Sequence, residues 1–257
     1  MAIYIADSCD QEILGGGGDT FVNPASTPQT VGGIAAGSSF PIPQTMQQMW
    51  DALLYPYTAP GANLTGGTVK EFGQNPSITL SWQAIRHTYA ITSIIVDGNS
   101  ITPTGNTQSG TQGASSVQDI DTTFLMQVSD GTTTTNDTTQ VTWEHRRYWG
   151  THSTFSNPSD SDILALTGAG VGTGNELSTN YVKNYNGING AGNYLVFCWP
   201  TSFGTTPTFT VNGLPNTAFT RIRAAGNFTN QYGFVEPYDV WISNTQQNSP
   251  ITLFSIS

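Results

Sequence analysis

The sequence predicts an all-β fold with three parts: an irregular N-terminal arm with one short helix, an Ig- or fibronectin-like β-sandwich, and a C-terminal β-sandwich with a short helix. Two observations predict this class. Only 9% of the 257 residues are charged, while Thr, Ser, Asn and Gln, which favour turns and exposed strand faces, outnumber them several-fold. Short apolar stretches also alternate with turn signals about every ten residues, as they do in β-sandwiches.

The predicted arm covers residues 1–60. Four consecutive glycines at 15–18 indicate a flexible hinge, and proline-containing segments at 23–28 and 41–43 indicate extended chain. Such a segment buries little surface by itself.

One stretch of the arm, residues 45–54, has a helical period, with Thr45 as the candidate N-cap and Tyr55-Pro56 as the stop. A helix of about three turns is not stable alone, so its apolar stripe must dock on the following domain or on other copies of the chain. The stripe supplies the candidate assembly residues Met46, Met49, Trp50, Leu53 and Leu54.

Residues 61–145 are predicted to form the Ig-like sandwich. Residues 77–82 alternate between polar and apolar side chains, and Asp97-Gly98 and Asp130-Gly131 are tight-turn signals between strand-like runs. Within the first of these strands, Trp82 is interpreted as a core tryptophan. Residues 105–116 contain Gly, Ser, Thr and Gln and no large apolar side chain, which predicts a loop.

Residues 146–257 are predicted to form the C-terminal sandwich. A capped helix is expected over 157–166, with Asp160 and Asp162 in its first turn, where negative charge meets the helix dipole. Asn186-Gly187 and Asn212-Gly213 are hairpin-type turn signals. The expected strands are 194–199, 208–211, 218–223, 234–242 and 251–256.

The charge balance excludes two classes of partner. With 7 Lys and Arg against 17 Asp and Glu, the chain lacks the cations that nucleic-acid binding or a basic membrane patch requires. No apolar run reaches the ~20 residues of a membrane-spanning helix, so no membrane insertion is expected. Residues 1–12 fit no secretory signal.

The cysteine content predicts neither a zinc site nor a disulfide framework. Cys9 and Cys198 are far apart, and neither lies in a Cys-x-x-Cys pair or a Cys/His cluster. Both are predicted to be free thiols. Cys198 lies within the apolar run 193–200, which indicates a small packed core side chain.

No catalytic residue, cofactor site or metal site is predicted. The glycine run at 168–174 lacks the spacing of a dinucleotide fingerprint and indicates a mobile loop. Asp119 with Asp121, and Asp160 with Asp162, could each offer two carboxylates to Ca²⁺, but an EF-type loop is missing from both.

One basic and aromatic cluster stands out in this acidic chain, between His145 and His152. Two interpretations of it remain open. In one, an aromatic face stacks on a sugar while arginine binds a carbohydrate or an anion. In the other, the cluster is an inter-domain seam, where arginine pairs with a carboxylate and the aromatic rings pack between the domains. Its residues are Arg146, Arg147, Tyr148 and Trp149.

Several segments stand out on both sides of the chain's centre: 18–23, 30–37 and 45–57 before the Ig-like module, and 147–150, 160–166, 194–200, 208–213 and 238–243 in the C-terminal module. They resemble segments of virion proteins of tailed bacteriophages. The likeness implies a non-enzymatic virion component, made in the host cytoplasm and homotrimeric. The same likeness implies a short fibre or appendage that attaches to other phage virion proteins through its N-terminal arm. A contact with host surface glycan is a separate expectation: the uncharged, Asn-, Thr- and aromatic-containing loops at 203–206 and 244–248 suit sugar hydroxyls, although the same composition also makes inert exposed strands.

Three other functions stay open. The first is a capsid decoration or cement protein whose two domains clamp neighbouring capsomers. Another is a glycan-degrading enzyme, for which the sequence offers only scattered carboxylates. A secreted lectin is the third, and the lack of a recognisable signal in residues 1–12 weakens it.

Overall fold

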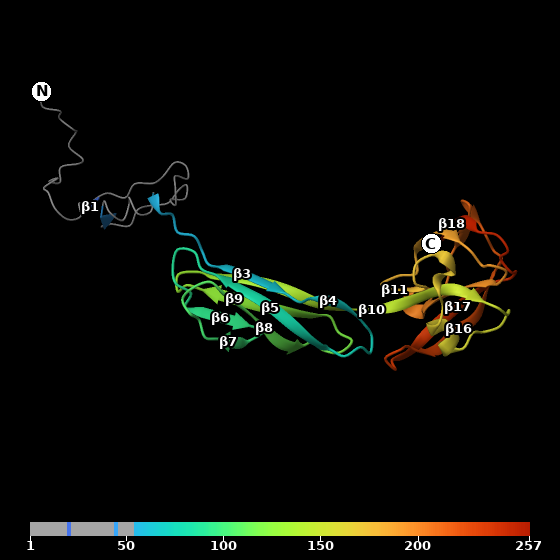
Figure 1. Cartoon of the computed structure of the whole chain (residues 1–257), viewed down its shortest axis with the longest axis horizontal. Coiled ribbons are helices and arrows are strands. Elements are labelled where there is room, and N and C mark those ends of the chain that lie inside the picture. Colours follow the sequence, from blue (N-terminus) through green and yellow to red (C-terminus); the bar gives the residue numbers. More distant parts are fainter. Residues whose placement is uncertain (1–19, 22–43, 46–53) are drawn as a thin grey trace, which may run out of the picture.

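The computed structural model describes residues 20–21, 44–45 and 54–257. The chain is all-β, as predicted: strands β1 (Thr20–Phe21) and β2 (Gln44–Thr45) pair with each other, and the other strands form two packed units. Figure 1 shows these two units end to end, joined by the long strand β10 (Thr134–His152). Most of the predicted arm, residues 46–53 of the helix expected over 45–54, and Cys9 lie outside the described residues.

The first unit, called the Ig-like unit below, is a sandwich of two sheets. One sheet has the order β3-β5-β8; the other runs β10-β9-β6-β7, with β4 parallel to β10. Asp97-Gly98 and Asp130-Gly131 make tight turns in it, as predicted. The strands other than β10 are β3 (Gly61–Thr65), β4 (Thr68–Glu71), β5 (Ser77–Ile85), β6 (Ser93–Val96), β7 (Asn99–Ile101), β8 (Gln108–Ser115) and β9 (Thr122–Ser129).

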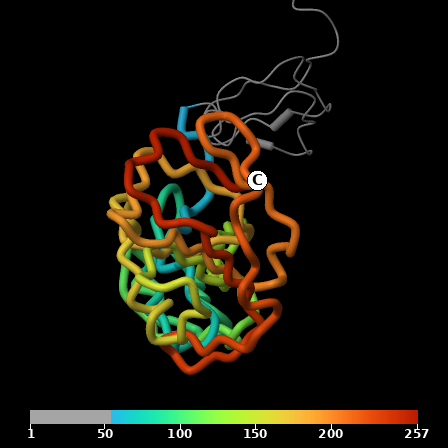
Figure 2. The backbone as a smooth tube through the Cα atoms, turned by 90° about the vertical axis from the view of Figure 1, so that its right-hand side faces the viewer, coloured from blue at the N-terminus to red at the C-terminus, as the bar shows by residue number. Residues whose placement is uncertain are grey.

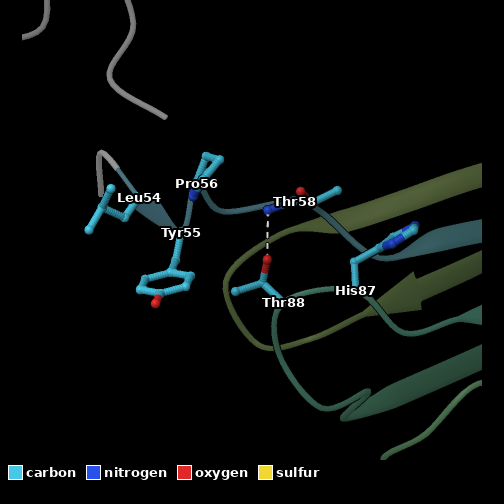
Figure 3. A pocket seen from close by; sticks show the side chains of 6 residues that line it. All are labelled: Leu54, Tyr55, Pro56, Thr58, His87 and Thr88. Carbon is cyan, nitrogen blue, oxygen red and sulfur yellow. Dashed lines mark hydrogen bonds between the residues drawn. The ribbon is translucent and has the colours of Figure 1, made fainter. Parts of the chain in front are cut away.

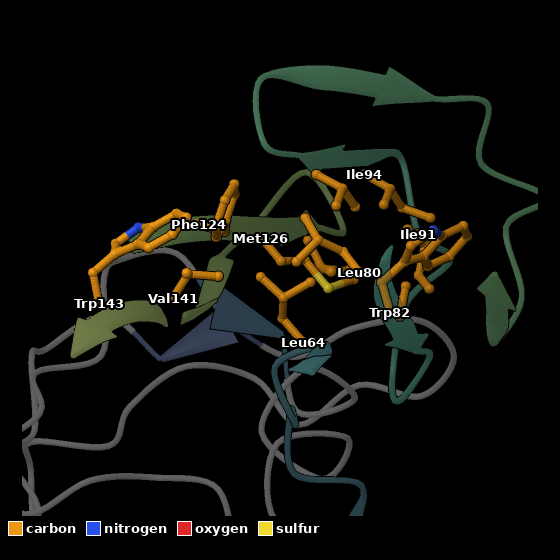
Figure 4. Close-up of a cluster of buried hydrophobic side chains, with 12 residues drawn as sticks. Leu64, Leu80, Trp82, Ile91, Ile94, Phe124, Met126, Val141 and Trp143 are labelled. Carbon is orange, nitrogen blue, oxygen red and sulfur yellow. The ribbon is translucent and has the colours of Figure 1, made fainter. Parts of the chain in front are cut away.

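The core of the Ig-like unit follows from the two-residue period of its strands. Leu80 and Trp82 on β5 point inward, and so do Phe124 and Met126 on β9, while the residues between them face outward. Figure 4 shows these side chains meeting between the sheets. Trp82 is therefore a core tryptophan, as predicted.

The loop predicted over 105–116 is wrong, because residues 108–115 form strand β8. The strand pairs with β5 along its whole length, from Gln108 opposite Ala84 to Ser115 opposite Ser77. It carries no large apolar side chain because the ring of Trp82 already fills the space: a Cβ at Gly110 would lie 2.7 Å from a ring carbon of Trp82.

The second unit, called the C-terminal unit below, is also a sandwich. The sheet β10-β13-β17-β16 packs one face on the sheet β12-β18-β14-β15 and the other face on the short helix α2. Viewed from its end in Figure 2, this unit lies in front of the Ig-like unit. Its elements after β10 are α2 (Asp160–Leu164), 3₁₀ helices η1 (Gly168–Gly170) and η2 (Thr201–Phe203), β11 (Asn175–Ser178), β12 (Lys183–Ile188), β13 (Tyr194–Pro200), β14 (Phe209–Val211), β15 (Leu214–Pro215), β16 (Phe219–Thr229), β17 (Val235–Ser243) and β18 (Ile251–Ile256).

Strand β13 reads as a continuous apolar run because both of its faces are covered. Leu195 and Phe197 point to the core between the sheets, whereas Val196 and Cys198 point to the core under α2. Cys198 has no disulfide partner among the described residues. Burial raises the pKa of its thiol far above the usual value, so it behaves as a packed apolar group.

The local signals of the C-terminal unit are partly confirmed. The helix forms where it was expected: Ser159 and Asp162 make a reciprocal capping box, and Asp160 and Asp162 lie in its first turn. Asn212-Gly213 turns the chain between β14 and β15. The turn predicted at Asn186-Gly187 is wrong, because both residues lie inside β12, where Gly187 has a φ of +78° and interrupts the pairing with β18.

Candidate functional site

The feature that distinguishes this molecule from two separate sandwiches is the junction between the units. Strand β10 runs through it without a break, so the predicted boundary between residues 145 and 146 falls inside a strand. Val141 and Trp143 of β10 belong to the Ig-like core, whereas Tyr148 and Trp149 belong to the cores of the C-terminal unit. The residues from 144 to 147 thus connect the two cores directly (Figure 1).

The centre of the junction is the carboxylate of Glu71, the last residue of β4. Its side chain is 2% exposed. Three side chains of the other unit and of β10 donate to it: Arg146 Nε at 2.7 Å, Asn230 Nδ2 at 3.1 Å and Gln231 Nε2 at 3.0 Å. A buried carboxylate is tolerated only when it is paired and hydrogen-bonded. The Ig-like unit thus provides the negative charge, and the residues on the other side of the junction provide its partners.

The turn between β16 and β17 is shaped to reach Glu71. Asn230 is buried, and its side-chain oxygen Oδ1 accepts hydrogen bonds from the backbone N–H groups of Tyr232 and Phe234. With its oxygen held in this way, its amide nitrogen faces the Ig-like unit and donates to Glu71 and, at 2.7 Å, to the carbonyl of Phe72. The hairpin end therefore acts as a preformed clamp on β4.

An aromatic stack lies beside this polar centre. The ring of Phe72 is parallel to the imidazole of His145, with centroids 4.1 Å apart, and it also contacts Phe234 at 5.4 Å. His145 meets the edge of Phe203, and its Nδ1 lies 2.8 Å from a carboxylate oxygen of Glu236 on β17. Residues of both units thus hold His145 in place.

The four residues of the predicted basic and aromatic cluster do not act as one group. Arg146 lies at the junction. Arg147 points into the C-terminal unit, where it bonds Glu176 at 2.6 Å and the carbonyl of Val182. Tyr148 and Trp149 are each 2% exposed and lie in different cores, because successive residues of a strand face opposite ways. Neither ring lies between the units, and neither offers a face to a sugar.

The junction is completed by Glu71, Phe72, Asn230 and Gln231, and no local sequence pattern marks these residues. A Glu followed by Phe, or an Asn-Gln pair in a turn, is common, and the partners are far apart in the chain, 159 positions for Glu71 and Asn230. The seam interpretation of the basic cluster predicted that an arginine pairs with a carboxylate, but it did not identify the acid.

Of the candidate assembly residues, Leu54 is described and Met46, Met49, Trp50 and Leu53 are not. Leu54 is 60% exposed. It lines an open hollow of about 470 Å³ at the start of the Ig-like unit, with Tyr55, Pro56, Thr58, His87 and Thr88 (Figure 3). Among these described residues no hydroxyl is hydrogen-bonded to His87; the Thr88 hydroxyl instead accepts the backbone N–H of Thr58.

The acidic pairs have structural partners. Asp119 accepts the N–H of Gly73 and Asp121 accepts the N–H of Trp143, each at 2.8 Å, while Asp160 pairs with Arg223. Within residues 54–257 and the two short N-terminal strands, no three His, Cys, Asp or Glu side chains are grouped to hold a metal ion. No helix in that same part of the chain has both the length and the apolar character to cross a membrane.

Comparison with known proteins adds little. No family model and no curated protein matches the chain. Among solved structures, an I-band fragment of titin, I67–I69, is similar at 10% identity and a TM-score of 0.25, over 74% of this chain and 57% of that one. The titin Ig tandem A164–A165 gives 11% and 0.23, over 74% and 83%. The eight N-terminal Ig domains of DSCAM give 8% and 0.21, over 76% and 26%. Likeness at this level has no bearing on function.

Proposed function

We propose that the chain is a structural component of a tailed-bacteriophage virion: a short appendage that attaches through residues 1–60 and carries the C-terminal unit outward, where it contacts host surface glycan. The observation that supports this most is the junction. An appendage must hold its outer end at a fixed place relative to the particle, and a shared strand with a satisfied buried carboxylate gives the two units a fixed mutual orientation.

Two further features support a structural role over an enzymatic one. Many ionisable side chains of the described residues are engaged in caps, ion pairs and backbone hydrogen bonds rather than gathered around a cavity. The resemblance of the segments named above to phage virion proteins supplies the type of particle.

Removal of residues 1–44 tests the attachment. The truncated chain should fold, with an unchanged circular dichroism spectrum, and should be missing from purified particles. Normal incorporation of the truncated chain would contradict the proposal. A mass by light scattering that is not a multiple of three chains of 27.4 kDa would contradict the homotrimer.

Labelled particles viewed by electron microscopy separate the remaining functions. A label at a small number of fixed positions supports an appendage, whereas a label over every capsomer would show the decoration protein instead. Sugar release from host envelope material, lost on replacement of a single Asp or Glu, would establish a glycan-degrading enzyme.

A further inference from the structure

We infer that strand β8 is a docking edge, and that its partner is the β8 strand of a second copy of this chain, paired antiparallel. Such pairing joins the sheets β3-β5-β8 of two molecules into one continuous sheet. It concerns how copies meet, and it holds or fails independently of the virion role proposed above.

The two edges of this sheet are treated differently by the fold. On the β3 side, side chains of β10 cover the backbone: Asp137 accepts the N–H of Leu64 at 2.6 Å, and Thr139 accepts the N–H of Gly67 at 2.9 Å. On the β8 side, no side chain of the described residues bonds to the backbone of 108–115. In an antiparallel pair about half of the backbone groups of an edge strand point away from its partner, and in the described part of the chain those of β8 have no strand partner.

Strand β8 also lacks the devices that protect an edge. It is eight residues long and has no proline, no charged residue and no bulge along its pairing with β5. Other edges in the described chain are protected: β7 has three residues, β15 has two and contains Pro215, β12 begins with Lys183, and β16 carries Arg221, Arg223 and two register shifts.

The charge pattern favours a copy of the same chain as the partner. The molecule has a net charge of −10, so two copies repel each other over most of their surface. Residues 98–118 contain no Asp, Glu, Lys or Arg, which makes β8 the middle of a neutral segment. A two-fold interface brings each patch against itself, and an uncharged strand meets its own copy without electrostatic cost.

The side chains leave room for this pairing. On the outward face, β8 presents Ser109, Thr111, Gly113 and Ser115, which are exposed and small. The inward side chains Gln108 and Gln112 bond to Thr102 and Val96 of the same molecule and leave the edge clear. Figure 1 shows β8 along the lower border of the Ig-like unit.

Thr111→Lys tests the inference in the full chain. In the pair, two lysines would lie close together on adjoining strands. The added lysine makes the net charge of each molecule less negative, so the overall repulsion between two copies becomes weaker. A loss of pairing must then come from the two lysines at the interface. The matched control is Thr138→Lys, at an exposed position of β10 in the opposite sheet, where β10 pairs with β9. Masses are measured by light scattering over a range of protein concentrations.

We expect the wild type and Thr138→Lys to reach twice the mass of Thr111→Lys at high concentration, and the wild type to fall to the variant's mass on dilution. The readout is the ratio of the wild-type mass to the mass of each variant, so contacts that all three proteins share do not affect the comparison. Equal masses for the wild type and Thr111→Lys at all concentrations, or an equal loss in Thr138→Lys, would overturn the inference.

Hydrogen exchange on the wild type gives a second readout that needs no variant. The backbone amides of β8 should exchange more slowly in concentrated than in dilute protein, while those of β5, already paired on both sides, should not change. Exchange of β8 that is independent of concentration would refute the pairing even if a variant failed to fold.

Discussion

Among single residues, Glu71 has the greatest effect on how the two units are held. Its carboxylate is almost fully buried and accepts hydrogen bonds from Arg146, Asn230 and Gln231. The net worth of such a pair compared with an apolar contact is small, but removing one member leaves the other charge buried and unpaired. The effect of substitution is therefore much larger than the gain from the pair itself.

Replacing Glu71 with Gln should lower the free energy of unfolding by about 3 kcal/mol, since Arg146 would lose its counter-charge in a buried site. The matched control is Glu144→Gln: in the described chain the Glu144 side chain makes no ion pair or hydrogen bond, so its replacement should cost less than about 0.5 kcal/mol. Urea denaturation of both variants measures the difference. Equal losses would show that Glu71 is not the centre of the junction.

How far residues could be predicted depended on the distance to their partners. Asp160 and Asp162 were placed correctly in the first turn of a helix because the signal lies within a few positions. Cys198 was placed by its apolar neighbours. Glu71 escaped prediction because its partners lie 75 and more positions away, and no local pattern marks a long-range ion pair.

Among the elements, β8 shows why a strand can be mistaken for a loop. The usual sign of a strand is a row of apolar side chains on one face. Here the inward positions are Gln108, Gly110, Gln112 and Ala114, and none carries a large apolar side chain. At Gly110 the ring of Trp82 on β5 occupies the space that a side chain would fill. Backbone pairing with β5 holds the strand, and a single sequence does not show that pairing.

The glycine run at 168–174 is a second element whose role depends on contacts with a distant residue. It wraps around Trp149: the indole Nε1 donates to the carbonyl of Val171, and the backbone N–H donates to the carbonyl of Gly174, both at 2.8 Å. Gly168 and Gly174 have φ values of +81° and +85°, so glycine is required for the path of the chain here.

Gly174→Ala should be strongly destabilising, because the added Cβ would lie 2.2 Å from the backbone oxygen of Leu166. Gly187→Ala is the matched control: φ is +78° there too, but nothing lies within 4 Å of the added carbon. We expect the control to cost about 1 kcal/mol for the backbone conformation alone, and Gly174→Ala to exceed it by about 2 kcal/mol through overlap. Thermal unfolding of both proteins checks this. Equal costs would mean that the loop is free to move aside.

At the scale of the whole molecule, the carboxylates make stability depend on acid. Burial alone would raise the pKa of Glu176, but the hydrogen bonds and charges of Lys183 and Arg147 outweigh it, and the pKa is lowered. The pKa of Asp162 is lowered by hydrogen bonds from Ser159. Backbone N–H groups of Thr133 and Thr132 overcome the effect of burial and lower the pKa of Asp130.

A carboxyl whose pKa is lower in the folded state binds more protons when the chain unfolds. Its stabilising contribution is present above the unfolded pKa of roughly 4 and is lost as the pH falls below it. We therefore expect the free energy of unfolding to fall steeply between about pH 4 and pH 2, with a shallower slope in Glu176→Gln. Denaturant titrations at several pH values provide the measurement, and a slope unaltered by the substitution would exclude Glu176 as a contributor.

Because strand β10 is continuous, the number of residues between its two ends decides which core each side chain faces. Since side chains alternate along a strand, one residue inserted between 144 and 147 would send Tyr148 and Trp149 to the wrong cores, whereas two inserted residues would restore the alternation. Insertion of two residues in this segment should therefore be tolerated better than insertion of one, and each added pair should also rotate the C-terminal unit through the twist of the strand.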